Sequence, residues 1–391
     1  MRDTLEGLKI IDTDSHLTEP HDLWTSRVPA AYRERVPHVK TVNGRQRWFV
    51  DRDVSLRGAG PDSVLRKGAG AKKVPGVAFN RFTIDDVHES SYDPRARVEV
   101  LDRLGIHAQI VYPNVAGFGN NRFLKIEDAE LRLLCVTLYN DAIAEMQSES
   151  GERLFPMALI PWWDIPAAVK EVERARAMGL RGVVTCNDPN AIGMPDLAQS
   201  DWDPLWEVCS TLKMPVNFHI GANSENFDAF GHAAWPSFGR EGRLALASAF
   251  LYLDNARIIG NLIYSGVLDR FPNCRFVSVE SGVGWLPFYL QALDYQLTEA
   301  APNELAHLQL KPSEYFRRQL YACFWFENLP PQSVIETIGV NNIMFETDFP
   351  HPTCLYPETR SRLLETTQHL DSEVQRRILQ DNAADLYRIP I

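Results

Sequence analysis

The feature of this sequence that most restricts its fold is a regular alternation of short apolar runs with longer amphipathic ones. The amphipathic segments 126–150, 166–179 and 203–213 carry apolar residues at helical spacing. The short runs are apolar on both faces, which is typical of parallel strands covered by helices. Eight such strands alternating with helices predict an α/β fold, a distorted (β/α)8 TIM barrel. The predicted strands are residues 8–16, 106–114, 153–163, 180–188, 215–221, 274–282, 319–326 and 341–349.

Two segments interrupt this alternation, and we expect both to be loop insertions. Residues 40–95 mix Gly, Pro, Lys and Arg with little periodicity, and residues 222–242 are rich in Gly, aromatic and small polar residues. Loops that follow barrel strands lie at the C-terminal face, where the catalytic residues of such barrels are found. The insertions are therefore expected to cover that face as lids, with decorative loops as the alternative. We expect one domain over residues 1–391.

Composition excludes several classes of function. A formal net charge of −11 in 391 residues, without clustered Lys and Arg, argues against a nucleic-acid partner. No apolar stretch approaches the roughly 20 residues needed to span a bilayer, and the start lacks signal-peptide features, so we expect a cytoplasmic protein without a membrane role. The six cysteines are scattered without a CxxC pair, and we expect them to be reduced core residues.

The residues that point to chemistry lie where predicted strands end. Asp14 and His16 are two apart on the first strand, so their side chains point to the same side. His219 ends the fifth strand and Asp348 ends the eighth. Buried carboxylates and imidazoles are costly unless they are paired or bind a metal, and a closed barrel would bring these four together. We predict that they bind a metal ion. The alternatives are a turn-capping aspartate at the first strand and a core histidine at the fifth.

Further residues are candidates for catalysis and substrate binding. Glu280 ends the sixth strand, and we expect it, Asp348 and His219 to be catalytic, with Glu280 acting either as a general base or as a ligand of the ion. Four more residues are candidates for substrate contacts because they lie at strand ends or in the second insertion: Trp163, Trp285, His351 and His232.

Several motifs resemble the ACMSD-like branch of the amidohydrolase superfamily, across nearly the whole chain. They are IIDTDSHLTEP, VNFHIG, GVLDRFPNCRFVSVESGVGWLPF, FETDFPHP and DNAADLYRIP. The resemblance implies a mononuclear metal enzyme, a hydrolase, hydratase or non-oxidative decarboxylase, with ligands at Asp14, His16, His219 and Asp348. Many members carry HxH at the first strand, where this chain has Asp14. Many also carry a histidine at the sixth, where this chain has Glu280.

The expected cofactor is one divalent metal ion. Carboxylates beside two imidazoles make an oxygen-rich site, which favours manganese or iron, with zinc as a further candidate. The fourth strand has no lysine near its end, so a carbamylated lysine bridging two metals is not expected. No GxxxxGK[ST], GxGxxG or GxSxG pattern is present, and no nucleotide cofactor is expected.

These features favour a hydrolase that uses a metal-activated water on an amide, ester or thioester of a small carbonyl-containing substrate. Glu280 decides this preference, because the known decarboxylases carry a histidine at its position. The alternatives are a non-oxidative decarboxylase of an aromatic or unsaturated carboxylic acid, and a barrel that has lost catalysis and binds a partner. The expected partner is a small-molecule substrate, and a homodimer burying part of an insertion is a hypothesis.

Overall fold

The computed structural model describes residues 4–68, 72–223, 235–328 and 331–391. Its centre is a parallel sheet in the order β8-β7-β1-β14-β13-β12-β11-β10-β9. These strands are β1 (Ile10–His16), β7 (Ile106–Tyr112), β8 (Leu154–Pro156), β9 (Ala158–Leu159), β10 (Val183–Val184), β11 (Val216–His219), β12 (Phe276–Val279), β13 (Leu320–Phe324) and β14 (Ile343–Phe345). Each lies inside one of the predicted strand segments, so the strand prediction is confirmed.

The sheet closes into a barrel because β8 and β9 are two parts of one strand. They are separated only by Met157, whose backbone N–H donates to the carbonyl of Val111 at 2.9 Å. On one side β8 pairs with β7, and on the other β9 pairs with β10. The two ends of the sheet are therefore joined, and the predicted (β/α)8 barrel is confirmed.

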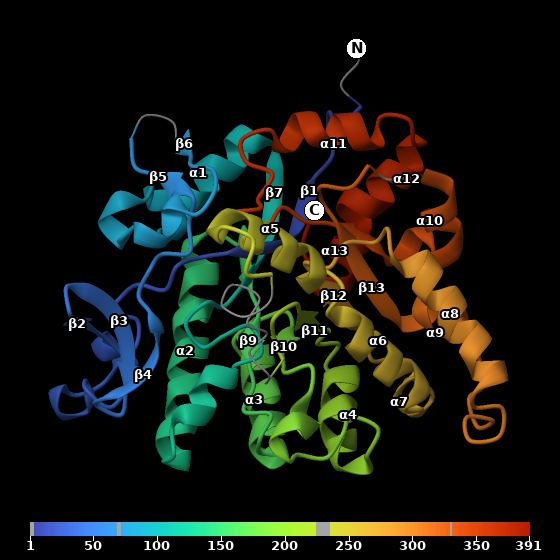
Figure 1. Cartoon of the computed structure of the whole chain (residues 1–391), viewed down its shortest axis with the longest axis horizontal. Coiled ribbons are helices and arrows are strands. Elements are labelled where there is room, and N and C mark those ends of the chain that lie inside the picture. Colours follow the sequence, from blue (N-terminus) through green and yellow to red (C-terminus); the bar gives the residue numbers. More distant parts are fainter. Residues whose placement is uncertain (1–3, 69–71, 224–234, 329–330) are drawn as a thin grey trace.

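Helices surround this barrel on the outside (Figure 1). The predicted helices correspond to α2 (Ala129–Glu149), α3 (Ile165–Ala177) and α4 (Asp203–Thr211). The others are α1 (Pro94–Leu104), α5 (Arg240–Leu251), α6 (Asn255–Tyr264), α7 (Val267–Arg270), α8 (Leu286–Glu299), α9 (Pro312–Gln319), α10 (Pro331–Ile338), α11 (Thr359–Thr367), α12 (Ser372–Arg376) and α13 (Asn382–Tyr387). They cover strands that are buried on both faces, as the continuous hydrophobicity of those strands requires.

The first insertion contains more regular structure than its sequence indicates. Strands β2 (His38–Val42), β3 (Arg45–Val50) and β4 (Val54–Gly58) form an antiparallel sheet, and β5 (Leu65–Arg66) pairs with β6 (Lys72–Lys73). The first half of β3 is exposed and its second half is buried. Its sequence therefore lacks the alternation of apolar and polar residues that predicts a strand. Trp48 of β3 packs against Trp24, whose ring lies 6.0 Å from that of Tyr139 on α2. The insertion is thereby attached to the barrel wall.

Residues 224–234 of the second insertion lie outside the described part of the chain. The lid function of both insertions and the single-domain assignment stay predictions. All six cysteines are free and buried, as expected. Among the described residues, no helix has the length and hydrophobicity of a membrane span.

Candidate metal centre

Side chains from three strand ends converge at the mouth of the barrel. Asp14 and His16 come from the last residues of β1, His219 is the last residue of β11, and Glu280 follows β12 directly. One ligand atom from each of these four residues lies within 4.8 Å of the others. His219 Nε2 is 3.6 Å from Asp14 Oδ1 and 3.3 Å from Glu280 Oε2. Closure of the barrel thus brings together residues that are more than 200 positions apart in the sequence.

Asp348 joins this cluster from the loop that follows β14. Its Oδ1 lies 3.5 Å from His16 Nε2, and its backbone N–H donates to the carbonyl of Asp14 at 3.0 Å. Asp348 and His16 also form a second group of potential ligands with His351. The structure therefore places all four predicted ligands, and Glu280 with them, in one buried cluster.

The surroundings of Asp14 fit a bound cation. The residue is fully buried, yet among the described residues neither of its carboxylate oxygens accepts a hydrogen bond. Burying a polar group without a partner is unfavourable, and a metal ion would supply the missing interaction. Two imidazoles with several carboxylates are a donor set that binds Mn²⁺, Fe²⁺ or Zn²⁺. The residues present thus fit a single divalent ion.

Burial shifts the protonation of these groups. Burial, and then the charges of Asp348 and Asp12, raise the pKa of Asp14 well above its usual range. Burial, and then the charges of Asp348 and Asp14, also raise the pKa of Glu280 well above its usual range. Burial lowers the pKa of His219 to about 4 and that of His16 well below its usual value. Without a cation the carboxyls hold protons, and the imidazoles are neutral and able to bind a metal.

A buried hydrogen-bond network forms the floor of the cluster. Asp12 accepts hydrogen bonds from the N–H of Thr347 at 2.8 Å and from Gln109 Nε2 at 2.7 Å. Arg97, which is fully buried, donates to Gln109 Oε1 at 3.0 Å and to the backbone carbonyl of His16 at 2.6 Å. This floor network of Asp12, Arg97, Gln109 and Thr347 connects α1, β7 and β1 to the residue that precedes Asp348.

Two of the clustered carboxylate residues have left-handed backbone conformations. Glu280 has φ 56° and Asp348 has φ 55°. Non-glycine residues rarely adopt this region, and such conformations are concentrated at functional sites. The N–H of Glu280 donates to Glu346 Oε2 at 3.0 Å, which holds the turn in place.

His351 lies beside the ligands. Its Nδ1 is 2.8 Å from Asp348 Oδ1, its Nε2 is 3.2 Å from Asn114 Oδ1, and its ring stacks on that of His16 at 3.7 Å. Burial alone would lower the pKa of His351, but Asp348, Asp62 and Asp14 raise it. His351 is therefore held as the partner of Asp348.

The sequence did not identify Phe118, which covers both imidazoles. Its ring centroid is 4.1 Å from that of His219 and 5.2 Å from that of His16. It follows Gly117, and the next residue is Gly119, where a Cβ atom would lie 2.5 Å from the carbonyl oxygen of Ala222. The glycine pattern VAGFGN, directly after a predicted strand, was the available signal for a tightly packed loop at the site.

The remaining predicted substrate contacts have other packing partners or are not described. Trp163 packs against Trp162 and lies under the guanidinium of Arg132 at 5.3 Å. Trp285 donates its indole N–H to the carbonyl of Ser281 at 2.8 Å. His232 lies outside the described residues. Their contact with a substrate stays a prediction.

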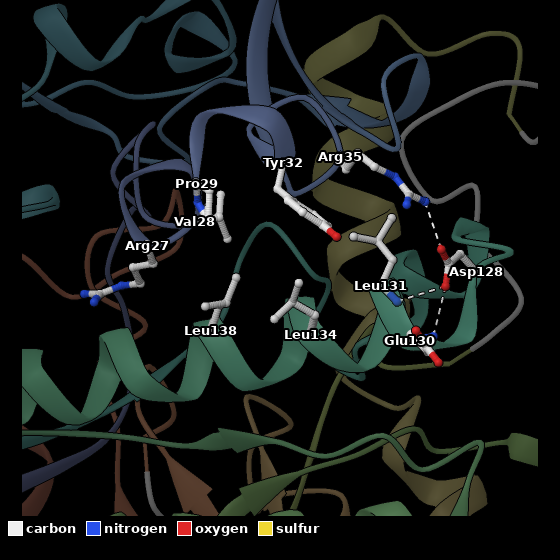
Figure 2. A pocket seen from close by; sticks show the side chains of 10 residues that line it. All are labelled: Arg27, Val28, Pro29, Tyr32, Arg35, Asp128, Glu130, Leu131, Leu134 and Leu138. Atoms are coloured by element: carbon white, nitrogen blue, oxygen red, sulfur yellow. Dashed lines mark hydrogen bonds and ion pairs between the residues drawn. The ribbon is translucent and has the colours of Figure 1, made fainter.

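A separate pocket of about 410 Å³ lies between residues 27–35 and the outer side of α2 (Figure 2). Apolar side chains of α2 form its base, and both arginines at its edge are paired with acidic residues. None of the clustered ligands lines this pocket.

A (β/α)8 barrel with imidazoles and carboxylates at the carboxyl ends of its strands defines the class of metal-dependent barrel enzymes. The amidohydrolase family model matches residues 93–389, so the chain belongs to this family. The chain is an enzyme of the amidohydrolase type, a class that includes hydrolases and carboxy-lyases.

Comparison with known proteins agrees with this assignment. The 2-amino-3-carboxymuconate-6-semialdehyde decarboxylase of Dictyostelium discoideum is 22% identical over 77% of this chain and 78% of its own. An amidohydrolase from Mycobacterium avium subsp. paratuberculosis has a TM-score of 0.75 at 22% identity, with 97% of this chain and 99% of the other covered. A dihydroxybenzoic acid decarboxylase from a Polaromonas species, solved with manganese and 2-nitroresorcinol, has a TM-score of 0.63 at 18% identity, with 97% of each chain covered.

Proposed function

We propose that this protein is a metal-dependent, non-oxidative decarboxylase of an aromatic or unsaturated carboxylic acid. The sequence alone favoured hydrolysis, and the decarboxylases among its relatives favour the alternative. The observation that carries the proposal is Glu280, a carboxyl group whose pKa burial raises, held beside the predicted metal ligands. Loss of CO₂ leaves an electron pair on carbon that must receive a proton, and a protonated carboxyl can donate it.

The predicted ligands are Asp14, His16, His219 and Asp348, and the proposed ion is manganese, with iron or zinc as alternatives. When bound, the ion would withdraw electron density from the substrate oxygens that contact it. The carbon–carbon bond to the carboxylate breaks, CO₂ leaves, and the proton of Glu280 passes to the carbon. The carboxylate of Glu280 then takes a proton from solvent. His351 holds Asp348 in place throughout.

The wall above the cluster suits a planar, apolar substrate. Phe118 covers the imidazoles, and the rings of Trp325 and Phe326 lie 5.5 and 5.3 Å from that of Tyr252, the residue that follows α5. Aromatic side chains of this kind favour stacking with an unsaturated or aromatic substrate.

Hydrolysis is the second candidate, because Glu280 replaces the histidine typical of the decarboxylases in this family. The same carboxyl could protonate the leaving group of an ester or amide after attack by water. The two functions use the same predicted ligands and differ only in the bond that breaks.

CO₂ release from manganese-loaded protein with a panel of hydroxybenzoates and unsaturated acids tests the proposal, with hydrolysis of aryl esters and anilides measured in parallel. We expect CO₂ release that is lowered by at least about 100-fold in Glu280→Gln, the range typical of a lost acid–base group. Glu299→Gln, an exposed substitution of the same kind on α8, is the control. Hydrolysis of the esters or anilides without CO₂ release would replace the proposal by its alternative.

A further inference from the structure

A buried asparagine outside the metal-binding cluster holds the ends of two barrel strands. Asn255 is the first residue of α6 and is fully buried. Its Nδ2 donates to the backbone carbonyls of Phe218 at 2.9 Å and Val279 at 3.3 Å, and lies 3.1 Å from Ser278 Oγ. Carbonyl oxygens only accept, so the amide must turn its NH₂ group toward the strands. Its Oδ1 then accepts from Asn187 Nδ2 at 3.2 Å, in the segment that follows β10.

The two carbonyls belong to the residues directly before His219 and Glu280. Because a peptide group is planar, a hydrogen bond to its carbonyl also orients the N–H of the next residue. The peptide between Val279 and Glu280 is held at both ends, since the N–H of Glu280 donates to Glu346 Oε2 at 3.0 Å. This support matters because Glu280 has φ 56°, a conformation that non-glycine residues rarely adopt.

The position of Asn255 does not depend on these hydrogen bonds. Helix α6 contacts β11, and its buried face consists largely of the aliphatic side chains of Ile258, Ile259, Leu262 and Ile263, which belong to the main apolar core. Packing of that kind fixes the helix, so its first residue is a rigid support for the peptide groups of both strands.

We propose that Asn255 is a positioning residue that holds His219, a predicted ligand, and Glu280, the proposed proton donor, in their relative orientation. His219 Nε2 lies 3.3 Å from Glu280 Oε2, so rotation of either preceding peptide would change both ion binding and proton transfer. The part that concerns proton transfer rests on the proposed decarboxylase function. Loss of a residue that orients a metal ligand typically lowers metal affinity or activity by about 10- to 100-fold.

The test replaces the amide by an apolar side chain of similar shape, Asn255→Leu. We expect the manganese dissociation constant, measured by calorimetry, to rise by about 10- to 100-fold. The electron paramagnetic resonance spectrum of bound manganese should change, because the His219 imidazole no longer approaches the ion in the same orientation. For CO₂ release, kcat should fall more than KM changes, since Glu280 acts in the chemical step.

The matched control is Asn382→Leu. Asn382 is also the buried first residue of a helix, α13, and its Nδ2 also donates to two carbonyls, those of Val340 at 2.7 Å and Ile343 at 2.8 Å. Ile343 begins β14, so these contacts lie at the amino end of a strand, opposite the mouth that holds the predicted ligands. Asn382→Leu should lower the urea midpoint of unfolding and leave manganese affinity and kcat unchanged.

A merely structural function of Asn255 predicts the same behaviour for the two leucine variants. Unchanged manganese affinity in folded Asn255→Leu, equal losses of affinity in both variants, or no manganese binding to wild-type protein would overturn the proposal. If Asn255→Leu does not fold, Asn255→Ser and Asn382→Ser replace the pair, and only the first should weaken manganese binding. Weakened manganese binding in a protein whose wild type releases no CO₂ would support the positioning of His219 and reject only the decarboxylase function.

Discussion

Asp14 and Asp12 show how differently two buried carboxylates can be supported. Asp12 accepts hydrogen bonds from Thr347 and Gln109, whereas Asp14 accepts none from the described residues. We predict that Asp14→Asn weakens manganese binding by at least about tenfold. Loss of a residue that only orients a metal ligand already lowers metal affinity by about 10- to 100-fold. The metal-free protein should be as stable as wild type or more so, because the buried carboxyl must take up a proton on folding and the amide need not.

Metal content and urea unfolding of the metal-free proteins measure both effects. Asp12→Asn is the matched control, and it should lower the free energy of unfolding by about 1–3 kcal/mol, because donors bind both carboxylate oxygens and the amide keeps only one acceptor oxygen. A metal-free Asp14→Asn protein that is as unstable as this control would show that Asp14 has a structural function.

The pKa shifts at the cluster predict how metal binding depends on pH. The pKa of Asp14, a predicted ligand, is raised, so this carboxyl holds a proton that a metal ion must displace, whereas Glu280 keeps the proton that it donates in catalysis. The pKa values of His16 and His219 are lowered, so these rings are already neutral and release none. Manganese affinity should therefore increase with pH until Asp14 has ionised. Calorimetry in two buffers of different ionisation enthalpy should detect net proton release, and its absence would contradict the predicted ligand set.

At the scale of secondary-structure elements, Arg97 of α1 connects three parts of the barrel. It donates to the carbonyls of Ser90 and His16 and to Gln109 of β7, and its guanidinium lies 4.4 Å from the ring centre of Phe349. Arg97→Met should lower the free energy of unfolding by about 3–5 kcal/mol, because buried acceptors lose a charged partner. Urea unfolding measures this. Arg103→Met, an exposed change on the same helix, should have little effect, and equal effects of the two would contradict the proposed function of the network.

The sequence predicted the barrel strands well, because burial on both faces makes each one a continuous apolar run. It also located the residues that cluster at the mouth of the barrel, since Asp14, His16, His219, Glu280 and Asp348 end such runs. It could not predict β2–β4, whose residues are mostly exposed and do not alternate. Nor could it select Phe118 or Tyr252, because their positions depend on contacts between loops far apart in the sequence.

For the whole molecule, the main apolar core contains none of the predicted metal ligands. It is formed by residues from all the barrel strands and most helices, so we expect removal of the ion by a chelator to leave the barrel folded. Far-ultraviolet circular dichroism should be unchanged. Free metal at 100 times its dissociation constant should stabilise the protein by about 2.7 kcal/mol, measured as a rise in the unfolding temperature. Loss of secondary structure on chelation would show that the ion is needed for folding.

The floor network and the wall of the site belong to different parts of the chain. Asp12, Arg97, Gln109 and Thr347 lie on or next to barrel elements, whereas Phe118, Tyr252, Trp325 and Phe326 lie in three connections between them. Mutation can therefore alter the side chains of the wall while the floor network keeps the predicted metal ligands in position. A lineage built on this plan can acquire new substrates without first losing its catalytic machinery. Laboratory evolution of this enzyme should accordingly find its changes of substrate range in the three connecting segments, and few in the floor.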